Sequence, residues 1–541
     1  MDIDDEPVRG TKPLAEIYER AHMAAIEPSC FEEAEAHQGW KQAMANEISM
    51  IEKNQTWQLV ERPVNRKVIG VKWVFRAKHN ADGNLNKLKA RLVVKGFSQK
   101  YGIEYFQTFA PVARLDTIRL LVALAAQMQW KIHQLDGKSA FLNGFLEEEI
   151  YVEQPKGLKI VGEEHKVYRL KKALYGLKQA PGAWYSRIDG YLASLEFERS
   201  ISEPTLYVKK QGSKTQLIVS LYVDDLLVTG GDQAMLTDFK CKMQQVFEMS
   251  DLGKMSFFLG MEVSQTQHGI FLSQKAFASK ILSKFSVQNC KATSTPVVIG
   301  KKLSSEGDFE KVSESNYRSL VGCLLCLTAT RPDIMFSVSL LSRFMHCCNE
   351  KHFQVAKRVL RYIKGTKSYG MLFSKVENMK LIGYANSDWV GSIDDMKSTS
   401  GYLFTLGSAI FCWSSKKQNV VAQSIDEVEY VAAASAVNQA IWLRKIMADL
   451  NLHQMEATEI NCDNQSAVAI VKNLVFHGRT KHFKIKFHFV REMKQAQEVK
   501  LIHCSSEEQL ADILTKPLSV LRFEDLRAKM GVCNMQAKEE C

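Results

Sequence analysis

Long hydrophobic runs are missing from this chain of 541 residues. A membrane-spanning helix needs about 20 consecutive apolar residues, and the sequence contains no such run. The first residues, Met-Asp-Ile-Asp-Asp-Glu, are acidic, whereas a secretory signal starts with a basic segment followed by an apolar one. The sequence therefore predicts an intracellular protein without a signal peptide or a membrane span.

The cysteines of this chain are irregularly placed. The 12 cysteines lack the regular spacing of a disulfide framework, which argues against a secreted scaffold and for a reducing compartment. Thiols concentrate in two places, the Cys323-x-x-Cys326 pair and a loose group formed by His346, Cys347, Cys348 and His352. Either a zinc site or buried structural thiols explain this grouping.

Charge is abundant but unevenly distributed. The formal net charge is +11, and 46% of residues are hydrophobic, as in ordinary globular proteins. Residues 1–60 carry 12 acids and 5 bases, whereas residues 61–100 carry 11 bases and 2 acids. A local basic block of this density favours contacts with phosphate groups, and the chain length favours several domains.

The basic block has the pattern of a β-hairpin. Residues 68–78 alternate like a strand, residues 81–84 (ADGN) supply a turn, and residues 88–96 return. Two interpretations remain open, a phosphate-binding flap and an edge hairpin whose lysines discourage edge pairing. The basic residues of the hairpin are Lys72, Arg76, Lys78, Lys87, Lys89, Arg91 and Lys95.

Two adjacent acids, Asp224 and Asp225, lie at a tight turn between apolar, β-branched strands within residues 216–231. Paired carboxylates repel each other, and Mg²⁺ favours carboxylate oxygens together with substrate phosphates. A third acid, Asp136, ends the strand predicted at 130–135. The pattern predicts a metal-holding hairpin with Asp136 as a third ligand; the alternatives are an exposed Asp-Asp turn and a helix N-cap at Asp136.

Many short motifs follow one another in a fixed order, and together they carry a resemblance. The motifs are 89–96 (KARLVVKG), 108–114 (TFAPVAR), 135–144 (LDGKSAFLNG), 173–181 (ALYGLKQAP), 222–225 (YVDD), 258–260 (FLG), 317–320 (YRSL), 330–333 (TRPD), 397–402 (KSTSGY), 462–464 (CDN) and 511–517 (ADILTKP). In this order they resemble the reverse transcriptase and ribonuclease H region of copia-type long-terminal-repeat retrotransposon polyproteins of plants.

The resemblance implies a mixed α+β and α/β multidomain protein. Its expected parts are an acidic, helical N-terminal entry (1–53), a right-hand polymerase with fingers, palm and thumb (54–297), a mainly helical connection (298–375), a ribonuclease H-like domain (381–518) and a C-terminal tail (519–541). We also expect the chain to be either a piece of a larger polyprotein or a truncated gene model, and to work in a cytoplasmic particle.

The resemblance further implies an RNA-directed DNA polymerase with two Mg²⁺ or Mn²⁺ ions in each active site, held in the polymerase by Asp136, Asp224 and Asp225. The expected partners are an RNA template, a DNA primer, an RNA–DNA hybrid and deoxynucleoside triphosphates. Lys89 and Arg91 match residues that grip the triphosphate, Phe141 matches an aromatic residue that excludes a 2′-hydroxyl, and Gly176 matches a glycine beside the new base pair. The expected nucleotide-binding residues are Lys89, Arg91, Phe141, Gly176 and Tyr222.

The nuclease part departs from the family pattern. Glu427, Asp463 and Asp512 match later members of a metal-binding Asp-Glu-Asp-Asp set, but Asn386 occupies the position expected for the first Asp. An amide carries no charge and binds a cation poorly. Asp388 lies two residues on, on the same strand face, and is the candidate substitute, yet we expect negligible cleavage of RNA–DNA hybrid.

Two further departures touch the polymerase. Gly137 replaces the usual Val, which is expected to loosen the strand that bears Asp136, and Gly182 replaces a usual Arg. These changes favour an alternative function, an inert nucleic-acid-binding remnant. A structural protein that binds partners through its helical connection is a third class, supported only by helix content.

Overall fold

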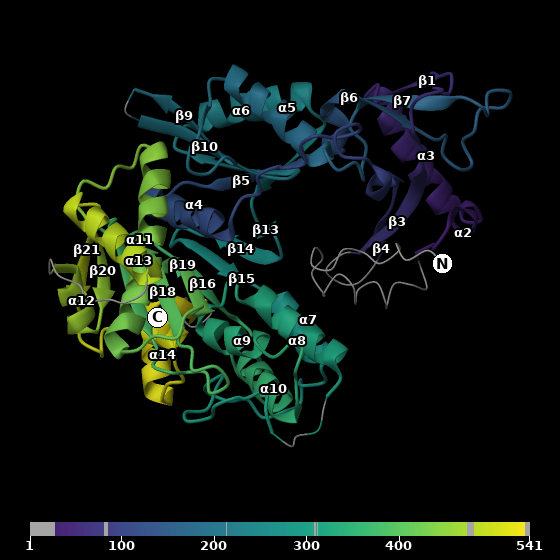
Figure 1. The fold of residues 1–541 in the computed structure, drawn as a ribbon. Coiled ribbons are helices and arrows are strands. Elements are labelled where there is room, and N and C mark those ends of the chain that lie inside the picture. The colour runs from purple at the N-terminus through teal and green to yellow at the C-terminus, as the bar shows by residue number, and fades with distance from the viewer. Residues whose placement is uncertain are drawn as a thin grey trace.

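The computed structural model describes residues 27–79, 85–212, 214–307, 310, 312–472 and 481–535 (Figure 1). Residues 1–26 of the expected N-terminal entry and the expected turn at 81–84 therefore lie outside the described residues. Among the described helices, none combines the length and the apolar character needed to cross a bilayer.

The predicted palm is a six-stranded sheet with the order β12-β5-β11-β10-β9-β8. Helices α5 and α6 lie on one side of this sheet and α4 lies on the other (Figure 1). Alternating side chains of β11 pack on both faces: Leu226 and Val228 share a core with α5 and α6, and Leu227 shares one with α4. The elements are α4 (Leu115–Met128), β5 (Ile132–Gly137), α5 (Ala180–Ser194), β8 (Glu198–Arg199), β9 (Leu206–Gln211), β10 (Lys214–Tyr222), β11 (Asp225–Gly230), α6 (Gln233–Val246) and β12 (Met249–Lys254).

The predicted fingers contain a four-stranded sheet, β1-β7-β6-β2, and the separate β3–β4 hairpin. Helix α3 packs on β4, and Trp40 meets Phe75 edge to face at 5.3 Å, so the described part of the N-terminal entry shares a core with the basic hairpin. The elements are α2 (Phe31–Glu35), α3 (Gln38–Lys53), β1 (Trp57–Val60), β2 (Val68–Ile69), β3 (Val71–His79), β4 (Leu85–Val94), β6 (Phe145–Val152) and β7 (Val167–Lys172).

A third sheet, β13-β14-β15-β16-β22, gathers strands from distant parts of the chain. Its last strand comes from the expected C-terminal tail, so a tail is the wrong description of residues 519–535, the part that the structure describes: Phe523, Leu526 and Val532 are buried, and their burial holds α14 and β22 in place. The elements are β13 (Phe257–Phe258), β14 (Met261–Gln265), β15 (Ile270–Ser273), α7 (Lys275–Lys284), α8 (Glu314–Leu327), α9 (Met335–Ser342), α10 (Glu350–Gly365), β16 (Tyr369–Phe373), α14 (Val520–Lys529) and β22 (Val532–Asn534).

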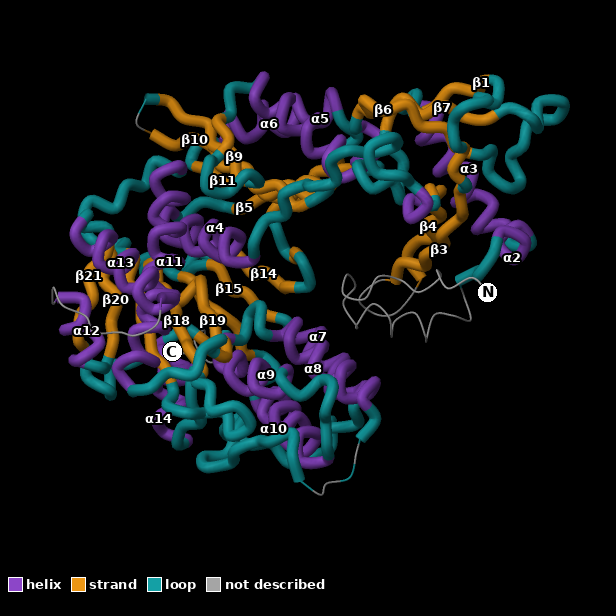
Figure 2. Tube along the Cα trace, viewed as in Figure 1, coloured by secondary structure: helices purple, strands orange, loops and turns teal. Residues whose placement is uncertain are grey.

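The nuclease-like domain is a five-stranded sheet with the order β19-β18-β17-β20-β21 (Figure 2). Strand β20 runs parallel to both β17 and β21, and the other pairs are antiparallel. The expected mixed α/β multidomain architecture is confirmed. The elements are β17 (Leu381–Ser387), β18 (Thr399–Leu406), β19 (Ile410–Lys417), α11 (Ile425–Asp449), β20 (Thr458–Cys462), α12 (Gln465–Lys472), α13 (Lys481–Gln495) and β21 (Val499–His503).

The palm packs directly on the nuclease-like domain through Arg119 of α4. This buried side chain donates from Nε to the carbonyl of Phe411 (2.7 Å) and from a terminal nitrogen to the carbonyl of Ala329 (3.0 Å). Its guanidinium lies 3.7 Å from the ring centroid of Trp413. The two domains therefore share a continuous core as well as a chain connection.

The loose His and Cys group has partners other than a metal. Nδ1 of His352 accepts a hydrogen bond from the backbone N–H of Asn349 (3.1 Å), and its ring stacks on Phe344 at 4.0 Å. His346 lies 3.0 Å from a guanidinium nitrogen of Arg318. These contacts favour structural roles for the group.

Candidate active site

The structure brings the three predicted polymerase acids to one corner of the palm sheet. Asp225 on β11 is the cross-strand partner of Asp136 on β5, and Asp224 lies in the turn that links β10 to β11. Two bonds fix this turn: the indole N–H of Trp184 donates to the carbonyl of Val223 (2.6 Å), and the N–H of Gly137 donates to the carbonyl of Asp224 (2.8 Å). The turn itself needs the left-handed conformation of Val223, at φ 55°.

The electrostatics of this corner suit a cation. Burial, reinforced by Asp136, raises the pKa of Asp224. Burial also raises the pKa of Asp225, with Asp224 and Asp136 adding to it, while a hydrogen bond from Gln134 (3.0 Å) opposes the shift. Within the described part of the chain, no basic side chain forms an ion pair with any of these three carboxylates, although Arg91 and Lys89 act to lower the pKa of Asp224 against its burial. The three carboxylates therefore repel one another.

The carboxylates fit Mg²⁺ as part of a site that substrate completes. In the described ranges, no group of three or more His, Cys, Asp or Glu side chains is placed to hold a metal ion by itself. Mg²⁺ is commonly bound by one or two carboxylates together with substrate phosphates and water. The open corner at Asp136, Asp224 and Asp225 matches that mode of binding.

The structure does not show the loosening of the strand end that was expected from Gly137. Its N–H is bonded to the carbonyl of Asp224, and it pairs across the strands with Met249. A Cβ at this position would lie 3.0 Å from the carbonyl oxygen of Asp224, so the glycine permits a close approach of the two strands that bear the acids. Gly182 lines a groove with Phe109 and Phe145.

The basic hairpin presents Lys89 and Arg91 toward the acids. Burial, followed by Arg91 and Lys78, lowers the pKa of Lys89, while Asp136 opposes the shift. Asp136 therefore acts electrostatically on a lysine of β4, and the flap interpretation of the hairpin gains support from this coupling.

Tyr175 links the hairpin to the acids and was missed from the sequence. The guanidinium of Arg91 lies 4.5 Å from the centroid of the Tyr175 ring, and the centroid of the Phe141 ring lies 5.2 Å from that of Tyr175. Burial raises the pKa of Tyr175 to about 12, with contributions from Asp224 and Asp136. Its place within the 173–181 motif was the available signal.

Glu47 of α3 is a second residue that sequence reasoning missed. It is buried, and its carboxylate accepts a hydrogen bond from the N–H of Leu92 (3.3 Å), the residue that directly follows Arg91 on β4. An acid among the buried apolar positions of α3 was the signal. Glu47 ties the helix to the strand that carries both basic residues.

Local packing explains the residue types at the two remaining nucleotide-binding candidates, Gly176 and Tyr222. Gly176 has φ +92°, and a Cβ there would lie 2.2 Å from the carbonyl oxygen of Val94, so a glycine is required for its contact with β4. The ring of Tyr222 meets Phe258 edge to face at 6.0 Å and Tyr222 pairs with Asp225 across the turn.

Replacing Tyr175 by Ala is expected to raise the KM for deoxynucleotide about tenfold, because Arg91 loses the ring that holds it. The Tyr175→Phe variant keeps the ring and should stay within about twofold of the unaltered chain, since a cation–π contact does not need the hydroxyl. Steady-state primer extension measures both. Equal KM values for the Ala and Phe variants would contradict the role of the ring.

A second acidic cluster lies at one edge of the nuclease-like sheet. Asn386 near the end of β17 and Asp463 directly after β20 lie on neighbouring parallel strands, whose carboxyl ends meet at this edge. Asp512, from the short 3₁₀ segment Leu510–Leu514, accepts a hydrogen bond from the amide of Asn386 at 2.5 Å. The structure therefore brings Asn386, Asp463 and Asp512 together as predicted.

Glu429, rather than Glu427, belongs to this cluster. The Glu427 carboxylate turns back to accept from the N–H of Gln423 (2.7 Å), whereas Glu429 is buried and accepts from the N–H of Ser387 (3.2 Å). Burial, followed by Asp463, raises the pKa of Glu429 to about 8. Two residues along a helix point in nearly opposite directions, so the prediction for Glu427 is wrong in position.

Asp388 does not join the cluster. Its carboxylate accepts a hydrogen bond from the N–H of Thr399. Burial raises the pKa of Asp388, and this hydrogen bond and Arg343 oppose the shift. Strand β17 ends at Ser387, so the alternation that would have placed Asp388 beside Asn386 no longer applies. The prediction that Asp388 takes over the metal-binding role expected at position 386 is therefore contradicted.

The Glu429→Gln variant is expected to become more stable relative to the unaltered chain as pH rises. A carboxyl with a raised folded-state pKa binds its proton more tightly in the folded state. The free energy of unfolding of the unaltered chain therefore falls as the pH rises from the unfolded-state pKa of Glu429 to about 8. The relative gain from pH 6 to pH 8 should be about 2 kcal/mol, as measured by urea unfolding. A gain that does not change with pH would contradict the assignment.

Comparison with known proteins identifies the family. The signature of the family "Reverse transcriptase (RNA-dependent DNA polymerase)" matches residues 54–299. The retrovirus-related Pol polyprotein from transposon RE1 of Arabidopsis thaliana is 38% identical over 510 residues, which cover 94% of this chain and 35% of that protein. The chain thus spans about a third of the length of this relative.

Shorter and more distant relatives also match. A transposon Ty5-1 protein of Saccharomyces cerevisiae is 35% identical over 307 residues, covering 56% of this chain and 99% of its own length. The solved structure of a foamy viral protease–reverse transcriptase in complex with RNA/DNA hybrid aligns with a TM-score of 0.48 at 13% identity, covering 87% of this chain and 54% of that one. The chain belongs to the reverse transcriptase family of copia-type retrotransposon Pol polyproteins.

Proposed function

We propose that this chain is an RNA-directed DNA polymerase that extends a DNA primer on an RNA template with deoxynucleoside triphosphates. The observation that carries the proposal is the meeting of Asp136, Asp224 and Asp225 at one corner of the palm sheet. The reacting parts belong to residues 54–297, with the connection (298–375) and the nuclease-like domain (381–518) holding the emerging duplex. A cytoplasmic particle is the proposed setting.

The three carboxylates are proposed to hold two Mg²⁺ or Mn²⁺ ions. When bound, two such ions stabilise the attacking and leaving oxygens of an in-line phosphoryl transfer. Asp136 and Asp224 are the main ligands in this proposal, and Asp225, whose carboxylate is held by Gln134, assists. The bonds from Trp184 and Gly137 to the turn keep the carboxylates in position while substrate binds.

Lys89 and Arg91 are proposed to neutralise the triphosphate. Cationic side chains at a transferring phosphoryl group stabilise the charge that develops there. Arg91 keeps its hydrogen-bonding nitrogens available because an aromatic ring, not a carboxylate, holds it; its buried Nε has no hydrogen-bond partner in the described structure. Phe141, packed against Tyr175, is proposed to exclude a 2′-hydroxyl from the sugar position.

Primer extension tests the proposal. The full chain is incubated with poly-rA, an oligo-dT primer and dTTP in the presence of Mg²⁺ or of EDTA. We expect extension only with the cation. Retained binding of the hybrid without any extension in Mg²⁺ or Mn²⁺ would contradict the polymerase assignment and favour an inert binding remnant.

A further inference from the structure

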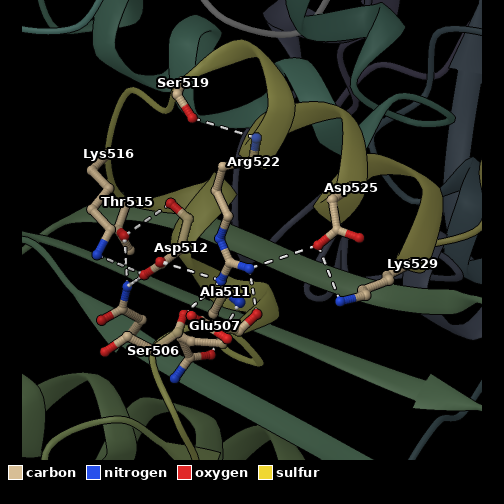
Figure 3. Close-up of polar contacts among 12 residues, drawn as sticks. Ser506, Glu507, Ala511, Asp512, Thr515, Lys516, Ser519, Arg522, Asp525 and Lys529 are labelled. Carbon is tan, nitrogen blue, oxygen red and sulfur yellow. Dashed lines mark hydrogen bonds and ion pairs between the residues drawn. The ribbon is translucent and has the colours of Figure 1, made fainter.

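The carboxylate of Asp512 in the nuclease-like domain is satisfied by its own neighbours (Figure 3). Its Oδ1 accepts from the amide Nδ2 of Asn386 at 2.5 Å and pairs with Nζ of Lys516 at 2.8 Å. Its Oδ2 lies 3.8 Å from a guanidinium nitrogen of Arg522. Asp512 is only 4% exposed, so these donors replace water around a buried charge.

Asn386 uses both amide hydrogens inside the cluster. The second bond runs from its Nδ2 to Oγ1 of Thr515, at 3.0 Å. An amide N–H is a donor and cannot ligate a cation. A carboxylate at this position would put two acceptor oxygens against each other, which is tolerable only with a cation or a shared proton between them.

The polymerase corner provides the contrast within the same chain. In the described ranges no ion pair reaches Asp136, Asp224 or Asp225, and among these three carboxylates only Asp225 accepts from a side-chain amide, that of Gln134 (3.0 Å). One acidic corner is therefore open to cations, whereas the other contains a donor where a ligand is needed. The residues of the nuclease-like cluster do not fit the two cations that this fold implies.

We propose that Asn386 and Lys516, through their bonds to Asp512, turn the nuclease-like acid cluster into a structural network that is complete without a metal, so that the domain does not hydrolyse RNA. One consequence rests on the proposed polymerase function. The RNA strand of each hybrid product has to be removed by a separate hydrolase that cuts RNA paired with DNA.

Metal binding tests the proposal independently of catalysis. In the full chain, the changes Asp136→Asn and Asp224→Asn together disable the polymerase corner. This double variant is titrated with Mn²⁺ by calorimetry, in parallel with a triple variant that carries Asn386→Asp as well. We expect at least tenfold tighter Mn²⁺ binding in the Asn386→Asp chain, and none in that chain after a further Asp463→Asn change. In EDTA the Asn386→Asp chain should have a lower Tm that Mn²⁺ restores.

Cleavage of a labelled RNA–DNA hybrid gives the second readout. The unaltered chain should cut no faster than its Asn386→Ala variant, and Asn386→Asp should raise the rate at least 100-fold. Mn²⁺-dependent cleavage by the unaltered chain that is lost in Asn386→Ala would overturn the proposal, and so would equal Mn²⁺ affinity with Asn or Asp at 386. Primer extension by the unaltered chain, run separately, reports only on the polymerase proposal.

Discussion

Replacing Asp224 by Asn is expected to lower the rate of primer extension by roughly 1,000-fold. The substitution removes a charge from the corner where the carboxylates meet, and ligand loss at a metal that stabilises a transferring phosphoryl group costs several kcal/mol of transition-state stabilisation. Affinity for the primer–template hybrid should stay within about twofold, because phosphate contacts made by basic residues dominate that affinity. Single-turnover extension and a filter-binding titration measure the two quantities.

An exposed acid on the same domain provides the matched control. Asp238 of α6 pairs with Lys242 one turn later, and both side chains are largely exposed. Asp238→Asn removes the same charge from the palm and should leave extension unchanged. Extension by the Asp224→Asn chain at the rate of this control would show that Asp224 holds no catalytic cation.

Replacing Arg331 by Met is expected to lower the free energy of unfolding by about 4 kcal/mol, because it leaves a buried carboxylate without its partner. Arg331 and Asp333 form a two-pronged ion pair at 2.9 and 2.7 Å, with side-chain exposures of 4% and 0%. The hydroxyl of Tyr362 donates to the same carboxylate at 2.5 Å, and Arg527 of α14 donates to that hydroxyl at 3.1 Å. The network joins the connection to the C-terminal helix.

A double variant separates the loss of the pair from the cost of burying a lone charge. Arg331→Met combined with Asp333→Leu removes both charges and should recover more than half of the lost stability. Urea unfolding of the three chains measures the difference. A double variant as unstable as Arg331→Met alone would mean that lost packing, and not the lone carboxylate, determines the cost.

The polymerase corner could be predicted from sequence because its geometry is local. Apolar strands flank Asp224 and Asp225 directly, and one antiparallel pairing with β5 is enough to bring in Asp136. Tyr175 and Glu47 were missed because their roles come from contacts with Arg91 and Leu92 on a strand far away in the chain. No periodicity in one segment reports such a contact.

The nuclease-like cluster shows where one-dimensional reasoning fails. Glu427 and Glu429 are both acids in the first turns of α11, and only the packing of the helix on β17 decides which one faces the sheet. The C-terminal helix α14 and strand β22 were missed, and the pairing partner of β22, strand β16, lies about 160 residues earlier in the chain. Both errors depend on tertiary contacts that no single segment reveals.

Counting the cations bound at the palm corner tests the central claim most directly. The full chain is assembled with an RNA template, a DNA primer that ends in a dideoxynucleotide, and the matching deoxynucleotide, and bound Mn²⁺ is counted by electron paramagnetic resonance beside the Asp136→Asn/Asp224→Asn chain. We predict two more ions in the unaltered complex than in the variant. Equal numbers of bound ions in the two complexes would contradict a shared cation site at Asp136, Asp224 and Asp225.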